Sequence, residues 1–180
     1  MKESKQSELR QFEVAGPFDI TLPGNRIFDR KECSKKFFSG EVKKYGKEIG
    51  CYVFSLRTGR GSLPYYVGKT WNSFEGEAFA VHKISDHYQQ IVGKHQGTPT
   101  MTFVILKKVR GRTPETVIKE LEKHLIQMAY MRNKNLSNKQ SLPKTRWAIK
   151  GVVSSGRGAP TAAENTFKQL MGYRGSGNES

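Results

Sequence analysis

Two tyrosines and a lysine lie in two short segments whose residue types could take part in acid–base chemistry or bind an anion. The two segments read Gly50-Cys51-Tyr52 and Tyr66-Val67-Gly68, and Lys69 follows the second directly. A phenol activates or orients a water near neutral pH where cationic neighbours lower its pKa from about 10, and an ammonium binds phosphate oxygens. The alternative is that both tyrosines are packing residues of strands and that Lys69 is a solvated lysine at a strand end. The spacing alone leaves both interpretations open.

A glutamate lies at the margin of an apolar helix face. The segment from about 113 to 131 begins with Thr-Pro and carries an apolar stripe, which predicts a helix. At about 100° per residue, Glu122 lies close to Ile118 and Ile126, four positions before and after it, whereas Glu120 points the other way. An unpaired carboxylate at such a margin is costly, so Glu122 needs a cation. That cation is either a neighbouring lysine or arginine, or a divalent metal.

A second helix is expected from about 75 to 92, where apolar residues recur at helical spacing before Gly93. Lys83 and His87 lie four positions apart on one flank of this helix. Either side chain could neutralise a phosphate, although a lysine lacks the two-donor fork of an arginine.

These residues need a sheet to hold them. Strands are expected at about 50–56, 64–68 and 101–108, with a turn at Thr58-Gly59-Arg60-Gly61 between the first two. We therefore predict a mixed α+β domain, a small α/β fold with a three-stranded antiparallel central sheet flanked by helices.

Both ends of the chain extend this core, which is expected to span residues 49–140. Residues 1–48 predict a hairpin or extended arm around Gly16-Pro17 and a helix from Asp29 to about Phe38, packed on the core. Residues 141–180 predict a basic, partly flexible extension with a short strand at 147–149, a loop at 154–160 and a helix from about 161 to 171.

The order of these features resembles the GIY-YIG nuclease family over about residues 50–138. The signature of that family is Gly-Ile-Tyr in one strand, Tyr-Ile-Gly in the next, a basic residue on the following helix and a glutamate on a later one. Here Cys51 and Val67 replace the isoleucines, both apolar exchanges that a buried strand tolerates. The family usually shows an arginine on the first helix, and this sequence has none between residues 68 and 92. Lys83 is the expected substitute, with His87 as the other candidate.

The resemblance implies a role for each remaining residue of the motif. Tyr52 would act at the attacking water, as general base or as its orienter, and Tyr66 would lie beside the phosphate that Lys69 binds. Glu122 would hold one divalent metal, Mg²⁺ or Mn²⁺. Asn138 would make a backbone or phosphate contact at the rim of the site, unless it is only a turn residue.

The charge of the chain favours a polyanionic partner. Its 180 residues include 31 Lys and Arg against 16 Asp and Glu, a net charge of +15. Basic residues outnumber acidic residues most strongly in the last third of the chain, where Arg146 and Arg157 are candidate DNA contacts. No apolar run approaches the roughly 20 residues that span a bilayer, and residues 1–16 lack the apolar stretch of a signal peptide. We expect a cytoplasmic protein that does not bind membranes.

The function predicted from the sequence is a metal-dependent endonuclease that hydrolyses the phosphodiester bonds of DNA, most readily duplex DNA. The alternative is a catalytically degenerate protein of the same fold that binds nucleic acid without cutting it. An RNA nuclease is less favoured because the sequence has no aromatic-rich platform for single strands. An enzyme that cuts both strands is expected to act as a homodimer.

Overall fold

The computed structural model describes residues 10–107, 115–139, 159 and 161–170. The chain divides into two compact units, Met1–Leu142 and Pro143–Ser180. In the second unit the described element is helix α6 (Ala162–Leu170), as predicted for about 161–171. The strand predicted at 147–149 and the loop predicted at 154–160 lie outside the described residues, apart from position 159. All the elements discussed below belong to the first unit.

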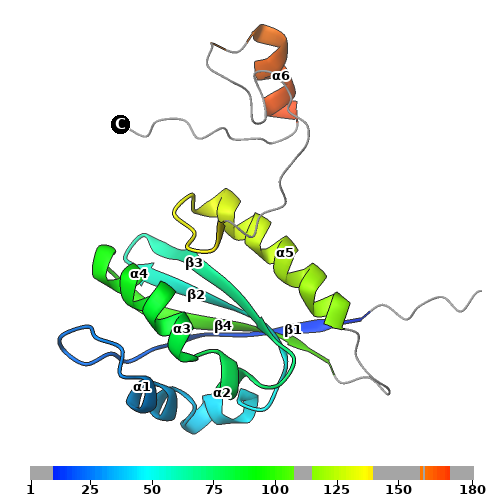
Figure 1. Ribbon diagram of the computed structural model, residues 1–180. Coiled ribbons are helices and arrows are strands. Elements are labelled where there is room, and N and C mark those ends of the chain that lie inside the picture. The colour runs from blue at the N-terminus through cyan, green and yellow to red at the C-terminus, as the bar shows by residue number, and fades with distance from the viewer. Residues whose placement is uncertain (1–9, 108–114, 140–158, 160, 171–180) are drawn as a thin grey trace, which may run out of the picture. The chain divides into compact units, whose positions relative to one another are not determined.

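A four-stranded antiparallel sheet forms the centre of the first unit. Its strands are β1 (Phe12–Asp19), β2 (Gly50–Thr58), β3 (Gly61–Thr70) and β4 (Thr98–Leu106), in the spatial order β1-β4-β2-β3. The three predicted strands are present as β2, β3 and β4. Strand β3 lies at one edge of the sheet, where its outer side is free of a neighbouring strand (Figure 1).

The prediction of three strands is wrong, because the arm around Gly16-Pro17 joins the sheet. It forms one strand, β1, which pairs with β4 from Phe12 opposite Leu106 to Asp19 opposite Thr100. The register shifts between Ala15 and Phe18, so the Gly-Pro pair forms a bulge and not a hairpin turn. A proline, which has no N–H to donate, is tolerated at an edge strand or a bulge. The alternation on both sides of the pair therefore belongs to a single edge strand.

Helices cover the two faces of the sheet in separate groups (Figure 1). One face carries α1 (Arg30–Phe37), the 3₁₀ helix η1 (Gly40–Tyr45), α2 (Phe74–Glu77), α3 (Val81–Lys83), the π-helix η2 (Ile84–Tyr88) and α4 (Gln89–Lys94). The other face carries α5 (Glu115–Arg132). As predicted, Asp29 caps α1, accepting a hydrogen bond from the N–H of Glu32.

Each face of the sheet has its own apolar core because side chains alternate along a strand. Aromatic residues such as Phe54, Phe103 and Tyr88 fill the core under α1 to α4. Smaller residues, among them Cys51 and Val67, pack against α5. Burial raises the pKa of the Cys51 thiol to about 12, so this cysteine is a neutral apolar residue. Its substitution for an isoleucine is compatible with a packing role.

The helix predicted from about 75 to 92 is interrupted. Ala80 is extended, with ψ at 146°, and separates α2 from α3, and the chain continues through one π-helical segment into α4. Phe74 and Phe79 are both buried, although five positions on a continuous helix would turn them about 140° apart. The break lets both rings enter the same core. The apolar spacing of residues 84–92 still belongs to one helical stretch, as predicted.

The packing of a neighbouring ring explains why position 68, at the end of Tyr66-Val67-Gly68, is a glycine. Gly68 is paired with Tyr52 of the neighbouring strand. A Cβ atom on Gly68 would lie 2.4 Å from the Cζ atom of the Tyr52 ring, closer than any van der Waals contact. The Tyr52 ring can lie across β3 only because position 68 has no side chain.

We expect Gly68→Ala to lower the free energy of unfolding by about 1–3 kcal/mol or more, since the methyl group must displace a fully buried ring. Denaturant unfolding followed by circular dichroism measures this change. Gly59→Ala, in the turn between β2 and β3, is the control, because a Cβ there meets no atom within 4 Å. Equal stability of the two variants would contradict the packing of Tyr52 over Gly68.

Candidate active site

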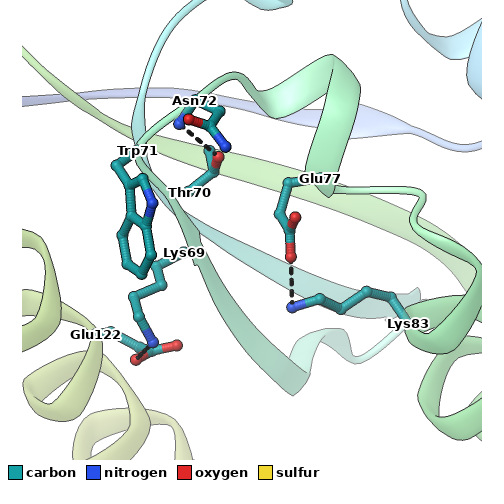
Figure 2. Close-up of a pocket in the computed structure, with 7 residues that line it drawn as sticks. All are labelled: Lys69, Thr70, Trp71, Asn72, Glu77, Lys83 and Glu122. Carbon is teal, nitrogen blue, oxygen red and sulfur yellow. Dashed lines mark hydrogen bonds and ion pairs between the residues drawn. The ribbon is translucent and has the colours of Figure 1, made fainter.

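A pocket of about 210 Å³ opens where β3 ends, beside the free edge of the sheet. Its lining comes from β3, the segment after it, α2, α3 and α5, as Figure 2 shows. The lining residues are Lys69, Thr70, Trp71, Asn72, Glu77, Lys83 and Glu122. Three of the predicted site residues, Lys69, Lys83 and Glu122, thus meet in one pocket.

Lys69 and Glu122 form an ion pair on the α5 side of the sheet. Lys69 lies on the same face of β3 as Val67 and therefore points toward α5, where its Nζ contacts Oε2 of Glu122. The two side chains keep 25% and 17% of their surface exposed. Glu122 thus has the cation partner that its apolar margin requires, and in this structure the partner is a lysine. Glu120 is exposed, as the helix phase predicted.

Lys83 forms a second cluster on the opposite side of the sheet edge. Its Nζ donates a hydrogen bond of 2.9 Å to the hydroxyl of Tyr66 and lies 3.2 Å from Oε1 of Glu77. Burial by itself would lower the pKa of Lys83, but Tyr66 and Glu77 outweigh burial, and the pKa is raised. Burial raises the pKa of Tyr66 as well, even though Lys83 opposes the shift. Near neutral pH, Lys83 is a cation and Tyr66 is a neutral phenol.

His87 lies next to this cluster but outside the pocket lining. Its ring lies against the Tyr66 ring, with centroids 4.4 Å apart, and its Nδ1 is 2.7 Å from Oγ of Ser137. Burial lowers the pKa of His87 below its usual 6.5. The nearby Asp86 carboxylate raises this pKa, whereas the positive charge of Lys83 lowers it further. His87 is therefore neutral at neutral pH. Of the two candidates, only Lys83 therefore places a positive charge in the pocket.

Tyr52 is placed differently from the other candidates. Its ring has no exposed surface, and its hydroxyl is buried without a hydrogen bond of normal geometry. Burial raises the pKa of Tyr52 well above 10, with further contributions from Tyr88 and Tyr66. The neighbouring cation that a phenolic base needs lies over the ring, 5.8 Å from its centroid, and makes no hydrogen bond to the hydroxyl. In this structure the Tyr52 hydroxyl is therefore out of reach of an attacking water.

We expect Tyr52→Phe to leave any catalytic rate within about twofold of wild type and to preserve or slightly raise the stability, because the hydroxyl that is removed is buried and makes no hydrogen bond of normal geometry. Thermal unfolding and single-turnover kinetics of the purified variant measure the two effects. A rate loss of about 10²-fold, the size expected of a general base, would instead assign Tyr52 a direct part in the reaction.

Asn138 binds the backbone of β3 at the free edge of the sheet. Its side-chain amide donates a 2.7 Å hydrogen bond to the carbonyl of Val67 and accepts one of 3.3 Å from the N–H of the same residue. Both polar groups of the side chain are thus occupied, and Asn138 is buried. Asn138 thus makes a backbone contact, but it does not line the pocket, and its amide is not available to a phosphate in this structure. Arg146 and Arg157 lie outside the described residues.

Glu77, Trp71 and Asn72 line the pocket although the sequence did not single them out. On a continuous helix Glu77 and Lys83 would point in directions about 120° apart, so only the break at Ala80 brings them together. Trp71 is 42% exposed, and its ring lies 5.9 Å from Nζ of Lys69 (Figure 2). Its place three positions after Gly68 was a usable signal, since tryptophan is enriched among the residues that dominate binding surfaces.

The carboxylates of the pocket decide whether a divalent metal fits. Within the described residues no group of three or more His, Cys, Asp or Glu side chains could hold a metal by itself. Mg²⁺ is commonly bound by one or two carboxylates, with water and substrate phosphates completing its shell. Glu122, with Glu77 across the same pocket, matches that pattern, provided that Lys69 gives up its contact with Glu122. The donor set therefore suits a metal that binds together with a phosphate.

Comparisons with known proteins add no assignment. A scan against models of protein families, a search of curated proteins and a search of solved structures each give no match for this chain. The resemblance to the GIY-YIG nucleases rests on the residues of the chain alone.

Proposed function

We propose that the protein is a metal-dependent DNA endonuclease with a GIY-YIG-type site at the end of β3. The observation that carries the proposal is the meeting of Lys69 and Glu122, from one side of the sheet edge, with Lys83, from the other side, in one open pocket. Both lysines line the pocket that a phosphate would enter. The net charge of +15 supports a polyanionic substrate.

Each group has a defined part in the proposed hydrolysis. Water attacks the phosphorus in line while the bond to the leaving 3′ oxygen breaks, and negative charge builds on the phosphate oxygens. The attacking water releases one proton to solvent, and the leaving 3′ oxygen takes up one proton from solvent. Lys69 and Lys83 stabilise that charge, and Tyr66 positions Lys83 through their 2.9 Å hydrogen bond. Glu122 is the residue that would hold Mg²⁺ or Mn²⁺, which when bound supplies Lewis acidity and a more acidic water. The raised pKa values of both tyrosines argue against a phenolate base.

Phosphate and metal should bind cooperatively at this site. Lys69 neutralises Glu122 in the structure, so a phosphate that attracts the Lys69 ammonium leaves the Glu122 carboxylate without its cation. That carboxylate would then be available to hold a divalent ion. The ion pair is in this view the resting state of a site whose two ligands arrive together.

Incubation of the purified protein with supercoiled plasmid tests the proposal. Mg²⁺ or Mn²⁺ should convert the plasmid to nicked or linear forms, and EDTA should stop the reaction. Linear product without a nicked intermediate would favour a homodimer that cuts both strands. Intact plasmid at all metal concentrations would contradict the proposed endonuclease.

One observation favours the second candidate function, a binding protein that does not cut. In the pocket each lysine already has a glutamate partner, so the four charged groups balance one another without a ligand. A binder of this kind would shift labelled duplex DNA in a mobility assay but leave plasmid intact.

Within the described residues, no helix is both long and apolar enough to span a membrane.

A further inference from the structure

A second, larger hollow lies between α4 and the turn that follows α5. Its volume is about 410 Å³, and we call it the α4 groove. Its polar lining consists of Gln90, Lys94, His95, Asn135, Ser137 and Lys139. Apolar side chains of Ile91 and Leu136 complete the groove. None of the elements that form it was assigned a ligand above.

The α4 groove differs from the active-site pocket in charge. The pocket pairs two lysines with two glutamates, whereas the described residues that line the groove include Lys94 and Lys139 and no carboxylate. Both lysines are exposed, and neither forms an ion pair with an acidic residue of the described part of the chain. Electrostatic attraction for an anion is therefore stronger in the groove than in the pocket.

A continuous row of contacts joins the two hollows. Lys83 in the pocket bonds to Tyr66, and the Tyr66 ring lies against His87. His87 in turn is 2.7 Å from the hydroxyl of Ser137, which lines the groove. The N–H of Ser137 donates a 2.7 Å hydrogen bond to the carbonyl of Tyr65 and so ties the turn to β3. The pocket and the groove thus lie along one strand edge, held by the same residues.

The side chains of the α4 groove are those that contact nucleic-acid backbones. Lysine, serine, asparagine and glutamine are among the side chains that contact phosphates and sugars, and these contacts are independent of base sequence. The apolar pair Ile91 and Leu136 offers a surface of the kind that a deoxyribose can cover. Phosphates bound in the groove would belong to the strand that enters the neighbouring pocket.

We propose that the α4 groove binds backbone phosphates of the DNA strand that flank the phosphate held in the pocket, with Lys94 and Lys139 as the anchoring cations. The proposal rests on the proposed function for the identity of the strand. It assigns substrate affinity mainly to the groove and the chemistry to the charge-balanced pocket.

The test compares Lys94→Ala/Lys139→Ala with wild type in binding to a fluorescein-labelled DNA duplex, measured by anisotropy in EDTA at several salt concentrations. Each lost phosphate contact lowers the slope of log K against log salt by about 0.9, so the double variant should lose about 1.8. With the two proteins binding equally at 1 M salt, this difference in slope makes the double variant bind roughly 60-fold more weakly than wild type at 0.1 M salt. The single-turnover cleavage rate at saturating DNA should stay within about twofold of wild type.

The control is Lys31→Ala/Lys35→Ala, which removes the same charge from exposed positions of α1, a helix that lines neither hollow. Equal binding and equal slopes for the two double variants would overturn the inference, as would absence of DNA binding by the wild-type protein. Weaker binding by the groove variant without any cleavage of plasmid would support the groove and refute the endonuclease. Thermal unfolding of both variants checks that the fold is retained.

Discussion

Glu122→Gln should abolish plasmid cleavage, with a rate at least about 10³-fold below wild type. A metal ion supplies several kcal/mol of transition-state stabilisation, and about 1.4 kcal/mol corresponds to a tenfold change in rate. Binding of DNA should stay equal or become tighter, because the variant removes one negative charge beside Lys69. Single-turnover cleavage and anisotropy binding in EDTA measure the two effects separately.

Glu120→Gln is the matched control for this experiment. Glu120 is exposed, two positions away on the same helix, and its loss should be close to neutral. If Glu122 only holds Lys69 in place, the Glu122→Gln variant should bind metal as tightly as wild type. Calorimetry of Mn²⁺ binding in the presence of a non-hydrolysable phosphorothioate duplex measures this affinity. Undiminished Mn²⁺ affinity in Glu122→Gln would leave Glu122 only its ion pair with Lys69.

Lys83→Met should lower the cleavage rate by about 10²- to 10³-fold, the range observed when one preorganised charge-stabilising donor is lost. Lys83 is buried, and the methionine keeps most of its apolar stem, so the fold should be preserved. Substrate binding should weaken much less than the rate falls, since the lost interaction grows as charge develops. Single-turnover kinetics across DNA concentrations separate the two quantities.

Two further variants define the nature of the cation at position 83. Lys83→Arg keeps the charge and should stay within about tenfold of wild type, although a larger head must fit a buried site. His87→Ala should leave the rate nearly unchanged, because a histidine of lowered pKa is already neutral above pH 6.5. For the same reason wild-type cleavage should not decline from pH 7 to pH 9. Loss of activity in His87→Ala, with a decline over that pH range, would transfer the role from Lys83 to His87.

The spacing of apolar residues in the sequence was sufficient to locate most elements. The runs of β-branched and aromatic residues in β2, β3 and β4 and the apolar stripe along α5 are local patterns. Each can be recognised without knowing what the element packs against. The same helix phase correctly set Glu122 at the margin of the core and Glu120 in solvent. The N-cap role of Asp29 is equally local, since it involves a residue three positions away.

Features that depend on contacts between distant segments could not be predicted in this way. The pairing of β1 with β4 joins residues more than 80 positions apart, and the sequence around Gly16-Pro17 is equally compatible with a hairpin. The break at Ala80 follows from the need to bury both Phe74 and Phe79 in one core, which local periodicity does not reveal.

The candidate site divides in the same manner. The sequence by itself predicted which groups have the chemistry for a phosphate site. These groups are Tyr52, Tyr66, Lys69, Lys83, His87, Glu122 and Asn138. The tertiary structure distinguishes the two tyrosines. The Tyr52 ring packs over Gly68 and its hydroxyl is buried, whereas the Tyr66 hydroxyl accepts a hydrogen bond from Lys83 of the pocket. Residue type and spacing specify what a side chain can do, but solvent access and charge partners arise only when separate strands and helices pack together.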